Sequence, residues 1–403
     1  MQARKLQLVF AYAALILMPW PSLRPFESSL AYGDLCMIVA AILNFDRSLR
    51  LQSFQLPLLL SCPFIVASQV FDADGTPAAV AQACYIFGFV LPFGWVAFAS
   101  LPVHRVVGVY LSAQGLSSLI AITQTFGLMG TIGKSRVWGT EDAMRAAGLN
   151  VSCSALCMSL TSLYCLLLYL RGHLSRVILM ALITIGLIAT MAKSTIFAIP
   201  AFLFYLYWEP HRKRVLSLLM LVLVIGGVAI WSSNTFQTRI GHIFDNISRR
   251  VDKTDHSLWE RTSTLTFALN LIPECYVFGL GYEGTGKHLT QHLGNTVHVY
   301  HIGLILIGGA VGAALHYWGI CNMCSTALSH RQLPLVVLIL THWLSVCTMP
   351  VQMLTYQYAP YVLVATILYA QSKAVVAAPR AHPKSSASRM DRLLRDQRAK
   401  AAA

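Results

Sequence analysis

The chain has 403 residues, of which 56% are hydrophobic and only 11% are charged, and its formal net charge is +14. Soluble globular proteins usually carry about 25% charged residues, so this composition excludes an ordinary soluble domain. Apolar runs recur from Leu6 almost to Gln371 with only short polar breaks. Since a bilayer core needs about 20 apolar residues per helix, we expect an all-α, polytopic membrane helical bundle with about 12 transmembrane helices.

The predicted spans follow one another along the chain, and their ends are placed to within a few residues. They cover residues 6–20, 30–45, 54–71, 78–101, 106–128, 151–170, 177–191, 194–208, 215–231, 299–320, 333–349 and 356–371. The first run follows Arg4 and Lys5 but lacks a small-residue cleavage site. We therefore interpret it as a span and not as a signal peptide.

Basic residues in the short loops predict the orientation, because cytoplasmic loops carry an excess of Lys and Arg. When the spans alternate, one side collects Arg4, Lys5, Arg47, Arg50, Arg105, Arg171, Arg176, Arg212, Lys213, Arg214 and Arg331. The basic tail 372–403 falls on the same side, where anionic lipid headgroups attract it, and we prefer this interpretation to nucleic-acid binding. Both termini are therefore expected in the cytoplasm, with residues 1–371 forming one membrane domain.

Two loops on the opposite, outside face are also basic, namely 129–150 and 232–297. Their cations are Lys134, Arg136 and Arg145 in the first loop, and Arg239, Arg249, Arg250, Lys253, Arg261 and Lys287 in the second. The orientation of the protein in the membrane does not require basic residues on the outside face. Their accumulation in these two loops therefore favours the binding of an anionic ligand. The alternative is that long loops escape the positive-inside bias.

Lys193 lies between two apolar runs with almost no loop to place it in water. A lysine near membrane depth costs about 2.5 to 3.5 kcal/mol on insertion scales and usually marks a site or a partner. The competing interpretation is that its side chain reaches the outside surface. Lys193 is the single near-buried cation that we find in the predicted spans.

The second outside loop contains three candidate site features. Residues 259–271 have apolar positions at helical spacing, which predicts a surface helix with Arg261 in its first turns. Gly279 and Gly281 follow in a Phe-Gly-Leu-Gly sequence that allows a tight turn with exposed backbone N–H groups. The tenth span then re-enters the bilayer near His298 and His301, where a neutral imidazole can accept a proton.

The stretch 261–312 resembles the signature region of the O-antigen ligase and polysaccharide polymerase superfamily. That region has an Arg near a Trp, a surface helix, a Phe-Gly-x-Gly turn, and a His at the start of a span with two glycines further in. Here these are Trp259 with Arg261, residues 278–281, His298, and Gly309 with Gly312. The distance to Gly309 favours His298 over His301, although Val299 stands where the family usually has Asn.

Two upstream segments extend the resemblance. Arg136 and Arg145 through Asn150 are similar to the family's outside Arg-x-x-Gly segment. The sequence Ala-Lys-Ser around Lys193 is similar to its junction between two short helices, with Lys in place of the family's Arg. The first five spans carry no motif beyond hydrophobicity.

The resemblance implies a metal-independent glycosyltransferase of the bacterial inner membrane, with a periplasmic active site and no cofactor. The donor would be a polyprenyl-diphosphate-linked glycan and the acceptor a hydroxyl group. Fixed cations stabilise the charge that develops on such a leaving group. The implied diphosphate-binding residues are Lys193, Arg136, Arg145, Gly279 and Gly281, and the implied catalytic residues are Arg261 and His298, with His301 as the alternative base.

Within this superfamily we favour an O-antigen or exopolysaccharide polymerase, with an O-antigen ligase acting on a lipid acceptor of lipopolysaccharide as the alternative. Expected partners are the glycan donor, a glycan or lipid acceptor, membrane lipids and other polysaccharide export proteins, but no nucleic acid. The rival class is a polysaccharide or lipid-carrier transporter or flippase, which predicts buried charged residues, internal repeats and broken helices. We find no repeat and, besides Lys193, no such residue.

Overall fold

The computed structural model describes residues 2–24, 30–45, 51–72, 74–125, 128–132, 146–190, 192–217, 256–275, 277–293, 300–347 and 355–377, with isolated positions between 218 and 255. It is about 81% helical, and the described residues contain no strand. This confirms the all-α class. The main helices are α1 (Gln2–Leu17), α2 (Tyr32–Asn44), α3 (Gln55–Phe71), α6 (Val103–Thr125), α7 (Cys153–Thr161), α8 (Tyr164–Leu167), α9 (His173–Thr190), α10 (Ala198–Trp208), α13 (His256–Leu271), α14 (Tyr282–Leu293), α15 (Tyr300–Ser329), α16 (Leu333–Val346) and α17 (Thr355–Ala377).

Four helical stretches are long and apolar enough to cross a membrane by length and composition, which indicates a membrane protein. They are Pro77–Phe98, Val103–Thr125, His173–Thr190 and Tyr300–Ser329, and the shorter apolar helices are Tyr32–Asn44, Gln55–Phe71, Ser194–Trp208 and Leu333–Val346. Every predicted span contains helical residues, although most of 215–231 lies outside the described residues. The number of about 12 spans stays a prediction.

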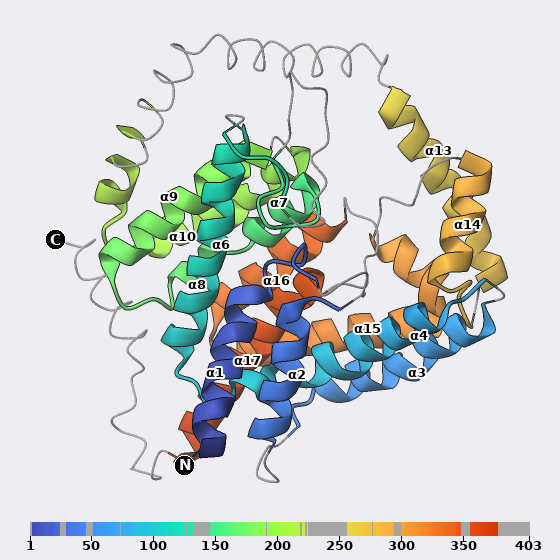
Figure 1. Cartoon of the computed structure of the whole chain (residues 1–403), viewed down its shortest axis with the longest axis horizontal. Helices are drawn as coiled ribbons and strands as arrows, with labels where there is room; N and C mark the ends of the chain where they lie inside the picture. The colour runs from blue at the N-terminus through green and yellow to red at the C-terminus, as the bar shows by residue number, and fades with distance from the viewer. Residues whose placement is uncertain are drawn as a thin grey trace.

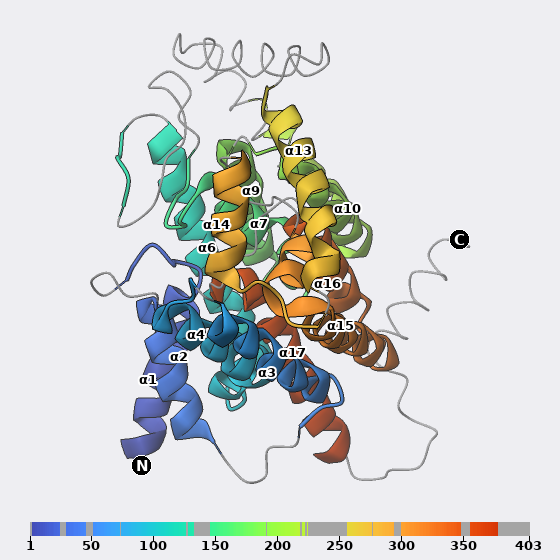
Figure 2. The same cartoon turned by 90° about the vertical axis from the view of Figure 1, so that its right-hand side faces the viewer.

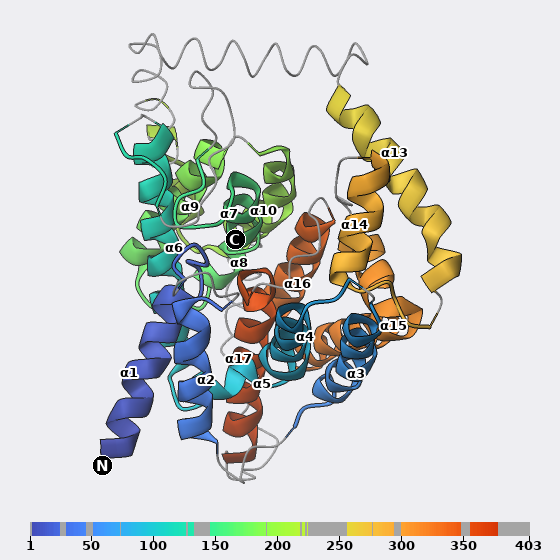
Figure 3. The same cartoon turned by 45° about the vertical axis from the view of Figure 1, so that its right-hand side comes forward.

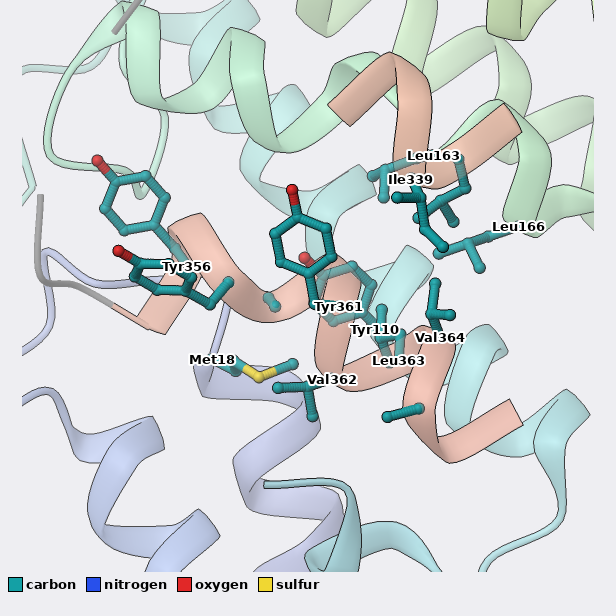
Figure 4. Packing of buried hydrophobic residues seen from close by; sticks show 14 of the residues in the cluster. Met18, Tyr110, Leu163, Leu166, Ile339, Tyr356, Tyr361, Val362, Leu363 and Val364 are labelled. Atoms are coloured by element: carbon teal, nitrogen blue, oxygen red, sulfur yellow. The ribbon is translucent and has the colours of Figure 1, made fainter. Parts of the chain in front are cut away.

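Helix α17 runs through the middle of the bundle (Figure 3) and is buried on all sides from 355 to 369. A helix that is apolar around its whole circumference belongs in a core. Figure 4 shows its residues Tyr356, Tyr361, Val362, Leu363 and Val364 among Met18, Tyr110, Leu163, Leu166 and Ile339. Helices α6, α7 and α16 therefore pack around one central element.

The outer helices pack in pairs around this centre (Figure 1). Helix α1 packs against α2, α6 against α9, and α3 against α15. Helices α13 and α14 lie together beside the first part of α15, at the end of the bundle opposite the chain's N-terminus (Figure 2). We call this the α14 end.

The stretch Pro77–Phe98 is a composite of short helices. It begins with α4 (Pro77–Ala83), continues as the π-helix η1 (Cys84–Val90) and α5 (Leu91–Phe93), and ends in the 3-10 helix η2 (Gly94–Phe98). Its start is defined by Thr76, whose side chain accepts a hydrogen bond from the N–H of Ala79 (3.3 Å), and by a proline at the first helical position.

Helix α15 is broken at Gly309, where the backbone has φ 72° and ψ 169°. Beyond the break, glycines line the side that faces α3. A Cβ at Gly312 would lie 3.2 Å from the side chain of Ile65, and one at Gly319 would lie 2.5 Å from that of Leu58. Small residues at these positions let the two helices approach closely, as is common where helices pack in membranes.

Candidate functional site

The turn that contains the Phe-Gly-Leu-Gly sequence packs against α15 at the break at Gly309. The N–H of Leu280 donates to the carbonyl of Leu306 (2.6 Å), which an unbroken α-helix would pair with residue 310. A Cβ at Gly309 would lie 3.0 Å from the nitrogen of Gly279, and a Cβ at Gly279 would meet the carbonyl oxygen of Leu306. Both glycines are therefore required because two backbones approach each other here.

The C-terminal end of α3 supplies acceptors for the same segment. Three further backbone N–H groups of the segment donate hydrogen bonds to side chains at this end of α3. The N–H of Gly279 donates to Ser68 Oγ (3.1 Å), that of Tyr282 to Gln69 Oε1 (2.7 Å), and that of Gly284 to Asp72 Oδ2 (2.7 Å). The Asp72 carboxylate thus lies at the N-terminus of α14, where a helix stabilises negative charge. The turn, the end of α3 and the break in α15 form one hydrogen-bonded unit.

This unit changes the role that the sequence predicted for Gly279 and Gly281. The N–H groups at 279, 280, 282 and 284 already have protein acceptors, so these four donors are not available to a phosphate. Gly281 has φ 76°, and a Cβ there would lie 2.5 Å from Asp72 Oδ2. A carboxylate therefore faces this glycine, and the expectation of exposed N–H groups is wrong at the four paired positions.

The start of α14 is also attached to the segment between α3 and α4. The hydroxyl of Thr76 donates to Glu283 Oε1 (2.7 Å), and Lys287 Nζ forms an ion pair with Asp74 Oδ1 (2.6 Å). Both partners of the ion pair are exposed, and such pairs contribute little stability. Lys287 nevertheless has a carboxylate partner, which makes it less suited to bind an added anion.

His301 lies just inside α15, and both of its ring nitrogens are engaged. Nδ1 is 2.9 Å from the hydroxyl of Tyr317, and Nε2 is 3.0 Å from Cys347 Sγ. The imidazole also lies over Trp343, with 4.4 Å between ring centroids. His301 therefore serves the contact between α15 and α16, and this arrangement does not support it as the alternative base.

The remaining predicted site residues are described only in part. His298, Arg136 and Arg145 lie outside the described residues, and Arg261 and Lys193 are described by their backbone alone. Arg261 is in the N-terminal half of α13, which confirms the helix expected there. Lys193 begins the 3-10 helix η4 (Lys193–Phe197), which joins α9 to α10 with almost no loop.

A buried carboxylate at the start of α2 was missed by the sequence analysis. Asp34 is only 4% exposed. Its Oδ2 accepts from the N–H of Ala31 (2.7 Å), and its Oδ1 accepts from the hydroxyl of Thr355 at the start of α17. The expectation that the predicted spans hold no buried charged residue besides Lys193 is therefore wrong. A lone Asp inside an apolar run was the sequence signal that could have identified this site.

Arg24 accompanies this carboxylate from the loop between α1 and α2. Its Nε donates to the carbonyl of Pro21 (2.7 Å), and its guanidinium interacts electrostatically with Asp34 and Tyr356. Burial lowers the pKa of Arg24 from its usual range, and these two neighbours partly offset that effect. The pair places one cation and one carboxylate at the α14 end of the bundle, next to the start of α17.

Among the described residues, no group of three or more His, Cys, Asp or Glu side chains is placed to hold a metal ion. A scan against models of known protein families gives no match for this chain, and no curated protein matches it either. The family resemblance rests on the residues quoted above.

Proposed function

We propose that this protein is a membrane glycosyltransferase that polymerises a polyprenyl-diphosphate-linked oligosaccharide on the periplasmic face of the bacterial inner membrane. The observation that carries the proposal is the contact between the Phe-Gly-Leu-Gly turn and the break at Gly309. These two parts of the resemblance are distant in sequence, and each uses its glycines to meet the other. The contact links α13, which carries Arg261, to the start of α15, which follows His298.

The proposed reaction needs a base and fixed cations. The oxygen of an acceptor hydroxyl attacks the anomeric carbon of the donor sugar while the bond from that carbon to the diphosphate oxygen breaks, so polyprenyl diphosphate leaves with the electron pair. His298 takes the hydroxyl proton, a contribution of about 10² to 10⁴-fold in rate. Arg261 and Lys193, with Arg136 or Arg145, stabilise the charge on the leaving diphosphate.

Separate replacement of Arg261 and His298 by Ala tests this proposal in the host bacterium. We expect surface polysaccharide to shorten or disappear at normal levels of inserted protein. Arg212→Ala and His288→Ala are matched controls, because both residues are exposed and neither belongs to the proposed site. Normal surface glycan in both site variants would overturn the proposal.

The same variants separate polymerase from ligase. A polymerase variant accumulates single repeat units on the carrier, because joining of the units is the step that is lost. A ligase variant accumulates long carrier-linked chains, because only transfer to the lipid acceptor is lost. Gel analysis of the extracted carrier-linked glycan distinguishes the two outcomes.

A lipid-carrier flippase is the second candidate, favoured by the buried carboxylate of Asp34 and by the broken helix α15, both of which that class predicts. A flippase variant would leave the carrier-linked glycan on the cytoplasmic face of the membrane. A polymerase or ligase variant would leave it on the periplasmic face. Labelling of the glycan by a membrane-impermeant reagent in spheroplasts decides between the two classes.

A further inference from the structure

Arg24 is the only lysine or arginine in the short loop 21–29, which the predicted orientation places on the outside face. Cytoplasmic loops carry the usual excess of Lys and Arg, so the orientation of the protein does not require a cation here. The side chain of Arg24 is only partly exposed. Withdrawal of a guanidinium from water has a cost that a bound anion offsets. The sequence analysis did not include Arg24 among its candidate ligand-binding cations.

The backbone that leads to Arg24 is fixed by three hydrogen bonds. Trp20 Nε1 donates to a carbonyl in α6 (3.1 Å), and the hydroxyl of Ser22 donates to a carbonyl ahead of α7 (2.6 Å). The N–H of Tyr32, the first residue of α2, donates to the carbonyl of Leu23 (3.2 Å). Because these contacts order the loop in advance, a ligand that binds to Arg24 does not have to order it.

The guanidinium of Arg24 is oriented through one of its nitrogens. Its Nε donates to the carbonyl of Pro21 (2.7 Å). A guanidinium has five N–H donors, so four donors on Nη1 and Nη2 remain. No acceptor for these four donors is present among the described residues. Two nitrogens in one plane can bind two oxygens of a phosphate group at once.

The buried carboxylate of Asp34 lies near Arg24 but does not occupy these donors. The two groups interact electrostatically, yet in the described part of the chain they form no ion pair. The carboxylate oxygens accept instead from the N–H of Ala31 (2.7 Å) and from the hydroxyl of Thr355. Asp34 therefore offsets the charge of Arg24 without direct contact and leaves its Nη groups open to a ligand.

Tyr356 connects Arg24 with the start of α14. It is 1% exposed, and it interacts electrostatically with both Arg24 and Tyr282. Tyr282 is the first residue of α14, and its N–H donates to Gln69 at the end of α3 (2.7 Å). Arg24 and the start of α14 are therefore both neighbours of one buried tyrosine, next to the hydrogen-bonded unit on which the proposed function depends.

We propose that Arg24 is a further phosphate-binding residue, whose guanidinium holds a phosphate group of a lipid at the α14 end of the bundle. The assignment of this phosphate to the diphosphate of the glycan carrier rests on the proposed function. The headgroup of an anionic phospholipid offers the same chemistry from a second source. In both cases charge-assisted hydrogen bonds from Nη1 and Nη2 reach the phosphate oxygens.

Four variants of the full-length protein separate a binding role from a structural one. Arg24→Gln removes the charge, and Arg24→Lys keeps the charge but loses the planar pair of donors. Lys287→Gln is the matched control, because it removes a cation from the same end of the bundle whose Nζ already pairs with Asp74 (2.6 Å). Asp34→Asn removes a negative charge near Arg24, which repels a phosphate.

Binding of geranylgeranyl diphosphate in neutral detergent micelles tests the proposal, with geranylgeraniol as the uncharged control. The readout is the ligand concentration that gives half of the maximal rise in melting temperature. We expect Arg24→Gln to need about tenfold more diphosphate than the wild type, which corresponds to about 1.4 kcal/mol. Arg24→Lys should need about threefold more, and it retains the test if Arg24→Gln does not fold. Lys287→Gln should match the wild type, and Asp34→Asn should bind at least as tightly.

Two results would overturn the proposal. One is wild-type affinity for the diphosphate in both Arg24 variants, or no binding by the wild type itself. The other is a loss of affinity in Asp34→Asn as large as that in Arg24→Gln, because removal of a repelling charge weakens binding only if both residues act through the packing of α17. Opposite effects of the two substitutions are expected from a phosphate-binding guanidinium alone.

A second titration, with phosphatidylglycerol, identifies the source of the phosphate. If Arg24→Gln weakens binding of the diphosphate alone, Arg24 belongs to the site of the carrier. Equal weakening of both ligands would assign Arg24 to a phospholipid headgroup and overturn its link to the carrier.

The outcomes also distinguish this inference from the proposed function. If Arg24→Gln weakens binding of the diphosphate while Arg261→Ala and His298→Ala leave the surface glycan normal, the proposed function fails and the phosphate site stands. If those two variants lose the glycan while Arg24→Gln binds the diphosphate as the wild type does, the proposed function stands and the inference fails.

Discussion

Replacement of Gly309 by Ala tests the contact between the Phe-Gly-Leu-Gly turn and the break in α15. Gly309 has φ 72° and ψ 169°, a conformation that costs residues with a side chain about 1–3 kcal/mol. The new Cβ would lie 3.0 Å from the nitrogen of Gly279 and closer still to the carbonyl group of Val277. The turn must therefore move, and the hydrogen bond from Leu280 to Leu306 is lost, at about 1–3 kcal/mol.

The two contributions together predict that the free energy of unfolding falls by about 2–6 kcal/mol in Gly309→Ala. Titration with SDS in mixed micelles measures this quantity for the full-length protein. Gly286→Ala is the matched control, because Gly286 lies inside α14 and a Cβ there meets nothing within 4 Å. The control should be stabilised by up to about 1 kcal/mol. Wild-type stability of Gly309→Ala would refute the break in α15.

Five further substitutions probe polar groups inside the bundle. Asp34→Ala should lower the free energy of unfolding by about 1–3 kcal/mol, because two buried donors lose their acceptor, and Asp34→Asn should lower it less; equal losses in the SDS titration would contradict this. Glu209 is buried, and its Oε2 lies 3.2 Å from Arg176 Nη1. Glu209→Gln should therefore lower the free energy of unfolding by about 3 kcal/mol, because it leaves the guanidinium without its partner. Adding Arg176→Met should recover part of that loss. If the effects of Glu209→Gln and Arg176→Met on the free energy of unfolding were strictly additive, the two side chains would not form an ion pair. His301→Gln should leave the surface glycan at the wild-type level, whereas loss of glycan at normal protein level would restore His301 as the base.

Local pattern predicted most helices with ends close to those observed. The predicted span 54–71 is α3 (Gln55–Phe71), and the predicted span 194–208 matches η4 with α10. These ends could be predicted because apolar periodicity and helix-breaking residues are local properties of the chain. The motif residues Gly279 and Gly309 were also identified from sequence, but their direct contact was not, since it depends on the conformation of α15 at a single residue.

The candidate site was predictable only in part. Asp34 was missed because one polar residue hardly changes the hydropathy of an apolar run, although it matters greatly once it is buried. The hydrogen bonds from the Gln124 side chain to the backbone at Gly130, Ala147 and Gly148 have no sequence signal at all, because a glutamine in an amphipathic or apolar helix usually needs no explanation. His301 was a reasonable candidate base by position, and only its contacts with α16 changed that interpretation.

The sequence by itself determined that this chain is apolar, helical and rich in basic loop residues, because those properties follow from composition and from periodicity over a few turns. Tertiary structure alone decided which polar groups remain free to act. The acceptor for the N–H of Gly279 is Ser68, which lies 211 residues earlier in the chain, and no local pattern encodes that pairing. Whether a backbone donor can bind a ligand depends on whether a distant side chain already occupies it.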